Sequence, residues 1–181
     1  MTINSLQSSV TLNPSRFSAG LDYTAAGQAS VTKSMVLETA FTAPGASNVY
    51  GTFAQKSTTS TSGCTTVSSI FNEHYLAGVF VDDKFNQNAP ANYGSGSFVN
   101  EGDYMDVMRV GFVVVRVNGT FDPQGDIYVN TSTDSAIFGT LQNSSTNGYL
   151  ISGNSYTKGV APISIESEAV DGLVLISINI P

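Results

Sequence analysis

The residues that could serve as a catalytic nucleophile and its base are very few. His74 is the one histidine and Cys64 the one cysteine of this 181-residue chain, and no Gly-x-Ser-x-Gly motif is present. Nucleophilic catalysis needs a base held against the nucleophile. A Cys64–His74 dyad is formally possible. We instead interpret Cys64 as a small apolar residue or half-exposed thiol, with an intermolecular disulfide as the alternative, and His74 as a polar residue at a strand start. No catalytic residues are therefore predicted.

Three stretches hold carboxylates or polar oxygen ligands, but none has the full pattern of a metal-binding loop. Glu101–Asp106 holds three carboxylates, Asn130–Asp134 has the odd spacing that begins a calcium loop, and Asp82–Asp83 is an acidic pair. None continues into the twelve-residue loop with glycine at position six and glutamate at position twelve. One histidine and one cysteine are too few for a zinc site. We predict solvated turns, no metal and no cofactor.

Tyrosines leave one binding function open. Carbohydrate sites use exposed aromatic rings as platforms, and the chain has 8 tyrosines but no tryptophan. A carbohydrate-binding or adhesin domain is therefore an alternative interpretation. It would gather Tyr93, Tyr104, Tyr149 and Tyr156 on one exposed face.

The charge pattern argues against a nucleic acid partner, and the lack of a long apolar run argues against a membrane-spanning segment. The formal net charge is -7, and the seven basic residues are scattered rather than clustered. Residues 1–100 carry four basic and five acidic residues (net -1), whereas residues 101–181 carry three and nine (net -6). No run of 18 apolar residues is present, and the start of the chain does not resemble a secretory signal peptide.

Hydrophobic spacing predicts strands almost everywhere, so any functional side chain must be positioned by sheets and their loops. Met105–Val117 is dense in β-branched residues, and Gly111 within it predicts a bulge or bend. Asn118–Gly119 suits a type I′ turn, which predicts a tight meander into Asp126–Val129 through a second turn at Asp122–Gly125. We predict an all-β fold, a compact antiparallel β-barrel or sandwich-like domain with an extended N-terminal arm.

The other expected strands are shorter or less regular. Gly172–Ile180 is apolar on both faces, which predicts a central strand covered on both sides. Lys158–Ile163 is a candidate strand with Pro162 at its edge or end. The polar composition of residues 130–147 predicts a loop with one short strand. Further strands are expected at Met35–Phe41, Asn48–Ala54, Leu76–Val81 and around Tyr149–Ile151.

The N-terminal region has too few apolar residues for a core. Its sparse apolar residues are enough to anchor an arm across a neighbouring surface. We divide the chain into an extended arm (1–30), a β-rich region with long loops (31–100) and a β-domain (101–181) packed with the region before it. The candidate contact residues are Ile3, Leu6, Val10, Leu12, Phe17 and Leu21.

The C-terminal half resembles the structural cement, or head decoration, proteins of tailed bacteriophages. Four stretches carry the resemblance: an acidic Gly-Asp turn before a strand with an Arg-x-Gly bend, a second Gly-Asp before a Val-type strand, a short apolar segment, and a small-residue-plus-Gly turn before a final apolar strand. These are residues 101–117, 124–129, 160–163 and 169–180.

The resemblance implies a non-enzymatic virion protein that stabilises an assembled shell. Such a protein would bind the outside of the phage head at junctions between capsomers, with the major capsid protein and its own copies, as a dimer or trimer, as partners. It would be made in the host cytoplasm and reside on the outer capsid surface. The contact residues above would then touch the capsid or a neighbouring protomer. Another virion or tail β-module is the alternative within the same class.

Overall fold

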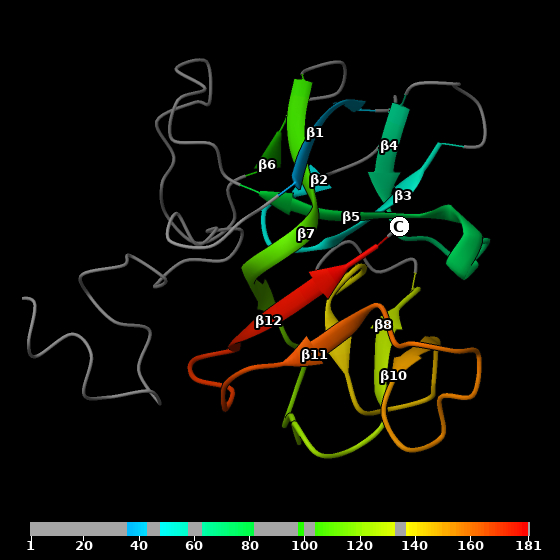
Figure 1. The fold of residues 1–181 in the computed structure, drawn as a ribbon, viewed down its shortest axis with the longest axis vertical. Helices are drawn as coiled ribbons and strands as arrows, with labels where there is room; N and C mark the ends of the chain where they lie inside the picture. Colours follow the sequence, from blue (N-terminus) through cyan, green and yellow to red (C-terminus); the bar gives the residue numbers. More distant parts are fainter. Residues whose placement is uncertain are drawn as a thin grey trace, which may run out of the picture.

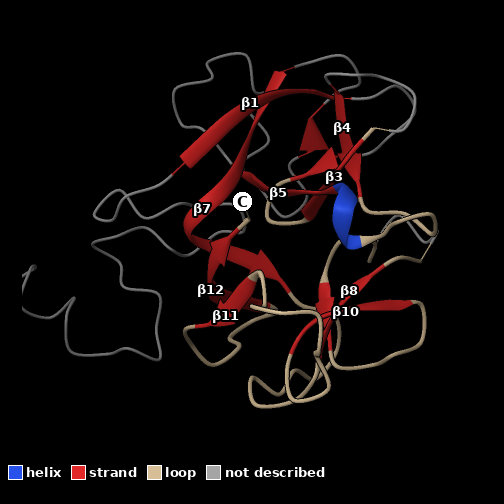
Figure 2. Cartoon of the chain, turned by 45° about the vertical axis from the view of Figure 1, so that its right-hand side comes forward, coloured by secondary structure: helices blue, strands red, loops and turns tan. Residues whose placement is uncertain are grey.

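The structure, a computed structural model, describes residues 36–42, 48–57, 63–81, 98–99, 104–132 and 137–180. Within these residues the regular secondary structure consists of strands and one 3-10 turn, η1 (Glu73–Tyr75), shown in blue in Figure 2. The predicted all-β class is confirmed. The strands are β1 (Val36–Thr42), β2 (Asn48–Val49), β3 (Phe53–Lys56), β4 (Gly63–Thr66), β5 (Leu76–Val81), β6 (Phe98–Val99), β7 (Tyr104–Arg116), β8 (Ile127–Asn130), β9 (Leu141–Gln142), β10 (Gly148–Ser152), β11 (Ile163–Ile165) and β12 (Leu173–Asn179).

The largest sheet has seven strands in the order β1-β4-β3-β5-β7-β12-β11, and it curls back so that β1 also pairs with β7. Its pairings are antiparallel except the one between β1 and β4, which is parallel. A three-stranded sheet, β10-β8-β9, lies in the lower part of Figure 1, and the short pair β2-β6 lies in the upper part. The result is the sandwich-like form of the prediction.

β7 is the strand that joins the upper and lower strands of Figure 1. Its N-terminal half pairs with β1 and β5, and its C-terminal half pairs with β12. The change of partner falls at Gly111, whose φ of 140° lies outside the range that other residues adopt easily. The predicted strand and its bend at this glycine are therefore confirmed.

The tight meander predicted after β7 is wrong. Asn118 does not have the positive φ that a type I′ turn requires at both central residues, although Gly119 does, with φ 73°. β7 pairs with β12 rather than β8, and the Asn118 N–H donates to Leu141 O at 2.7 Å. The chain crosses into the second sheet here instead of reversing. The turn at Asp122–Gly125 is present, closed by Gly125 N–H donating to Asp122 O at 3.2 Å.

Two further strand predictions need correction. Lys158–Ala161 is a loop, and the strand begins at Ile163, directly after Pro162. β12 is central, between β7 and β11, but only one of its faces is fully buried: Val174, Ile176 and Ile178 alternate with half-buried residues. The second face of β12 is therefore covered less completely than its apolar pattern predicts.

The core consists of two clusters on either side of β5 and β7, and each takes side chains from both the 31–100 and the 101–181 regions. The larger includes Phe53, Val79 and Ile176, all 0% exposed. The smaller includes Tyr50, Ala54, Cys64, Ala77, Phe80 and Val107. Each fully buried aliphatic or phenyl side chain contributes about 1.5–3 kcal/mol.

β5 and β7 approach so closely that a glycine is required between them. A Cβ added at Gly78 would lie 2.2 Å from Met108 O and 2.6 Å from Val107 Cγ1, and Gly78 has a φ of 153°. No side chain fits at this distance. Gly78 therefore sets the spacing between the two strands that separate the core clusters.

Candidate functional site

The predicted contact residues of the arm cannot be placed on this fold. Ile3, Leu6, Val10, Leu12, Phe17 and Leu21 lie outside the described residues. Any site must therefore be built from the residues that the structure does describe, beginning with those that could do chemistry.

Cys64 and His74 occupy different environments. Cys64, on β4, is buried in the smaller core cluster at 8% exposed. His74 is exposed on η1, which leads directly into β5, and its backbone N–H donates to Asn72 Oδ1 at 2.9 Å. A nucleophile must be reachable by its substrate. The buried thiol is packed as an apolar residue and the histidine sits in a capped turn before a strand, as the simpler sequence interpretation predicted.

Among the residues considered for metal binding, the structure shows Asn130 in a role in the fold. Asn130 is buried, its Nδ2 donates to Gln142 Oε1, and its Oδ1 accepts from the Ser132 N–H at 2.8 Å. Asp82–Asp83, Glu101, Asp103 and Asp134 lie outside the described residues. Over the described ranges, no three His, Cys, Asp or Glu side chains are grouped so that they could hold a metal ion.

Asp126 ties two loops of the lower sheet together. Its Oδ1 accepts from the Ser155 N–H at 2.8 Å. The hydrogen bond from the Ser155 side chain, followed by that from its backbone, lowers the pKa of Asp126 below its usual value. This carboxylate therefore fixes the loop after β10 rather than presenting a reactive group.

Tyr149 and Tyr156 come together around Lys158, at a place where the β4–β5 connection meets the β10–β11 loop. Lys158 Nζ donates to Tyr149 Oη at 2.5 Å, lies 3.4 Å from Glu73 Oε1, and stands 4.7 Å from the centre of the Tyr149 ring. The edge of Phe71 meets the Tyr149 ring at 5.0 Å between centroids and an interplanar angle of 88°. We call Phe71, Glu73, Tyr149, Tyr156 and Lys158 the Lys158 cluster.

The electrostatics of the Lys158 cluster keep its lysine charged. The hydrogen bond to Tyr149 is the main cause that raises the pKa of Lys158. Burial, followed by the charge of Glu73, raises the pKa of Tyr156. Glu73 Oε2 is covered and accepts no hydrogen bond in the described part of the chain. The Glu73–Lys158 pair leaves the cluster without net charge.

The Lys158 cluster does not form an open aromatic platform. The Tyr149 ring already contacts Phe71 and the Lys158 ammonium. Tyr93 lies outside the described residues, and Tyr104 begins β7. The structure therefore brings together two of the four tyrosines that a carbohydrate site would use, and the ring of one is occupied.

Exposed apolar side chains flank the Lys158 cluster along the sequence. Among the described residues the large exposed ones are Ile70 (60% exposed), Tyr75 (38%) and Val160 (92%). Ile70 and Tyr75 border Phe71 and Glu73, and Val160 follows Lys158 by two positions. The connection carrying η1 and the β10–β11 loop thus hold the three large apolar side chains that are exposed among the described residues.

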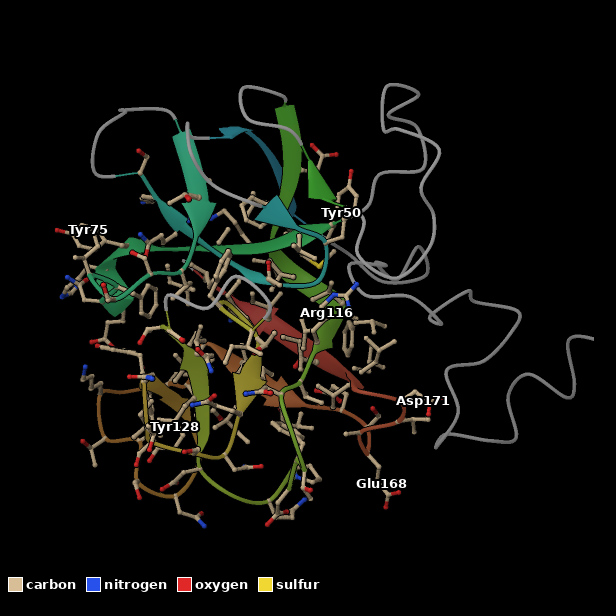
Figure 3. All side chains as sticks on the ribbon, turned by 180° about the vertical axis from the view of Figure 1, so that it is seen from behind. Tyr50, Tyr75, Arg116, Tyr128, Glu168 and Asp171 are labelled. Carbon is tan, nitrogen blue, oxygen red and sulfur yellow. The ribbon has the colours of Figure 1, made fainter. Side chains whose placement is uncertain are left out.

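An acidic hairpin forms a second distinct surface. Glu166, Glu168 and Asp171 are exposed in the connection between β11 and β12. Figure 3 shows Glu168 and Asp171 at one margin of the molecule and Tyr75 at the opposite margin. Over the ranges that the structure describes, no lysine or arginine forms an ion pair with these carboxylates. The hairpin thus presents uncompensated negative charge.

Arg116 is the cation nearest this acidic hairpin in the strand register, because it pairs with Leu173 at the start of β12. Its Nε donates to Tyr50 O at 3.2 Å, and burial lowers its pKa. Figure 3 shows Arg116 turned toward Tyr50 rather than toward Asp171. Arg116 therefore holds the upper strands against β7 and leaves the hairpin acidic.

The sequence prediction did not identify the Lys158 cluster. Tyr149 and Tyr156 were named, but their partners Phe71 and Glu73 come from a connection far away in the chain. Only the fold brings these segments together. As a separate point, the described residues contain no helix long and apolar enough to cross a membrane.

Comparisons with known proteins give a consistent result. A family model described as "Structural cement protein (E217 gp24/Pam3 gp6)" matches residues 7–179. A chain from a solved structure entitled "The capsid of Myoviridae Phage XM1" has a similar fold, with a TM-score of 0.63 and 15% sequence identity. The similarity covers 86% of this chain and 89% of that chain. No curated protein matches the sequence at a significant level.

Proposed function

Since the chain belongs to the structural cement protein family of phages, we propose that it binds the outer surface of the phage head and stabilises the assembled shell there. The family membership, which spans residues 7–179, is the observation that carries this proposal. The protein has the capsid cement role of its family. The finer proposal concerns where it binds, through which residues, and with which partners.

The partner that this role requires is the major capsid protein in its assembled form. A protein that binds the assembled shell but not the separate subunits stabilises the shell by mass action. We place the binding site at junctions between capsomers, because a bridge across a junction resists separation of the units on both sides. Such an interface buries roughly 1,000 Å² or more. No enzymatic step is part of this role.

The arm supplies the contact in this proposal. The six apolar residues Ile3, Leu6, Val10, Leu12, Phe17 and Leu21 lie in the part of the sequence with net charge -1, whereas residues 101–181 carry -6. Neutral polar surface costs less to desolvate than charged surface. An extended segment also covers a large area for few residues, although ordering it costs free energy. We therefore assign residues 1–24 to the capsid or to a neighbouring protomer.

In this proposal the acidic hairpin speeds the association of the protein with the shell. Its exposed carboxylates, Glu166, Glu168 and Asp171, lack ion-pair partners among the described residues. Charge of one sign on a surface speeds association with a surface of opposite sign, and the effect weakens as salt screens it. The complementary surface on the partner would be basic.

Deletion of residues 1–24 tests the contact assignment. The truncated chain should lose binding to purified capsids in a co-sedimentation assay, while its β-domain still unfolds cooperatively on heating. The matched control is the full-length chain with Glu166, Glu168 and Asp171 changed to Gln, Gln and Asn. This control should bind at equilibrium but associate more slowly at low salt. Unchanged binding by the truncated chain would overturn the arm assignment.

Two measurements test the remaining parts of the proposal. A cement protein should be present in purified virions in hundreds of copies, comparable to the shell protein, whereas a tail component would be present in tens or fewer. Native mass spectrometry of the free protein tests the expected dimer or trimer. Oligomerisation would raise the effective concentration of each arm near its site. A copy number in the tens would favour the tail alternative and refute capsomer-junction binding.

A further inference from the structure

The β10–β11 loop is held across the domain by one side chain. Its first part is fixed because the Ser155 N–H donates to Asp126 Oδ1 at 2.8 Å, and its last part because Pro162 O accepts from the Asn179 N–H at 2.8 Å. Between these points, residues 157–160 are exposed, and a Cβ at Gly159 would meet nothing within 4 Å. In this stretch Lys158 alone forms a side-chain hydrogen bond or ion pair with other elements of the described chain.

Lys158 joins two segments that are distant in sequence. Its ammonium contacts Tyr149 Oη at 2.5 Å on β10 and Glu73 Oε1 at 3.4 Å on η1. The same ammonium lies over the Tyr149 ring, 4.7 Å from its centroid. Lys158 is half exposed, and Glu73 is 26% exposed. The link is therefore electrostatic and accessible to solvent and salt.

Beneath the ammonium lies an aromatic pair at the margin of the main core. Phe71 is 7% exposed, belongs to the larger core cluster, and meets Tyr149 edge to face. Tyr149 is half-buried and packs against the same cluster. Moving Lys158 away uncovers the Tyr149 ring and the phenolic oxygen that now accepts its hydrogen bond.

We propose that residues 156–161 form an electrostatically latched strap, closed by Lys158 on Glu73 and Tyr149, which opens reversibly and uncovers the Tyr149–Phe71 aromatic pair. The strap does not depend on the capsid-binding proposal. Ion pairs with this exposure are weak, so loss of one partner should change the opening equilibrium by only about 1.5–5-fold. A strap of this strength opens without unfolding the domain.

Salt should act on the strap in a defined direction. The Debye length falls from about 10 Å at 0.1 M to about 3 Å at 1 M ionic strength. The Glu73–Lys158 attraction is therefore screened at high salt, whereas the neutral packing of Phe71 on Tyr149 is not. High salt should open the strap and leave the core intact.

Trypsin reports strap opening directly, because it must take the Lys158 side chain into its own binding pocket. Cleavage after Lys158 therefore requires Lys158 to leave Glu73 and Tyr149. The chain has only seven basic residues, so mass spectrometry resolves each cut. An added short peptide substrate serves as the reference for the activity of the protease at each salt concentration.

The experiment compares the full chain with Glu73→Gln and Tyr149→Phe, which remove one partner of Lys158 each and keep the shape of the side chains. We expect cleavage after Lys158 to accelerate about 1.5–5-fold in each variant relative to cleavage of the reference peptide. The wild type should show a similar rise between 0.1 M and 1 M salt, and the double variant should show almost none.

Two results would overturn the strap. One is an unchanged relative rate at Lys158 in both variants, which would mean that its contacts do not restrain the loop. The other is an equal acceleration after Lys56, in β3, which would mean that the whole domain opens. Lys56→Met is the matched control, because it removes an exposed lysine from another element and should leave the rate at Lys158 unchanged.

Discussion

Replacing Gly78, within β5, by alanine should weaken the domain more than the same change at the turn residue Gly119. The added Cβ would lie 2.2 Å from Met108 O, about 1 Å closer than a normal contact. Met108 O belongs to the backbone of β7, so it cannot rotate away as a flexible side chain would. β5 must therefore move away from β7 and weaken the pairings of Val79 with Met108 and of Phe80 with Val107.

Two costs add up at this position. Overpacking a well-packed core costs about 1–3 kcal/mol, and a φ of 153° in a residue with a side chain costs about 1–3 kcal/mol more. We expect a loss of about 3–5 kcal/mol, a large part of a total stability of about 5–15 kcal/mol. For a chain of this size the melting temperature should fall by about 10 °C.

Gly119→Ala is the matched control that separates these two costs. Gly119 also has a positive φ, 73°, but an added Cβ would meet nothing within 4 Å. It should lose about 1–2 kcal/mol from backbone strain alone. Urea unfolding followed by far-UV circular dichroism measures both variants, since the chain has no tryptophan to report by fluorescence. Equal midpoints for the two variants would refute the argument that β5 and β7 are in backbone contact at Gly78.

Two other substitutions test polar contacts in the lower sheet. Gln142→Met removes a buried amide whose Nε2 donates to Ser144 O at 2.7 Å and to Thr146 O at 2.8 Å, and whose Oε1 accepts from Asn130. The free energy of unfolding, measured in urea, should therefore fall by about 2–3 kcal/mol. A change under about 0.5 kcal/mol would contradict this role. Asp126→Asn tests how the stability of the domain depends on pH. The pKa of Asp126 is lowered in the folded state. Its contribution to stability is therefore present above the unfolded pKa of about 3.9 and is lost as the pH falls through the folded pKa. The wild type should have the higher urea midpoint at pH 7, and the two midpoints should converge as the pH falls below the unfolded value and through the folded one. A constant difference would exclude the carboxylate as the cause.

The strands that could be predicted from sequence are those whose pattern is strong over a long range. β7 was predicted because β-branched residues fill it, and its bend was predicted because Gly111 interrupts them. Leu76–Val81 coincides with β5 because an apolar run of six residues suits a strand that is buried along its whole length. In both cases the local signal and the tertiary burial agree.

The errors arise where a local signal competes with a distant partner. Asn118–Gly119 favours a hairpin, but β12 takes the edge of β7 that β8 would have needed. Lys158–Ala161 is apolar enough for a strand, yet Lys158 is drawn to Glu73 and Tyr149, and the ladder starts only after Pro162. The Lys158 cluster could not be predicted for the same reason, because its members become neighbours only when the β4–β5 connection meets the β10–β11 loop.

The pairing of β1 has a mechanical consequence. β1 is hydrogen-bonded along most of its length to β7, from Val36 opposite Val110 to Phe41 opposite Tyr104, and its end also pairs with β4. A pull directed along β1 from its N-terminal end loads these bonds in shear, so that several must break together, whereas a sideways pull would peel them one at a time. A chain tethered through the residues before Val36 would therefore transmit tension into the centre of the sheet.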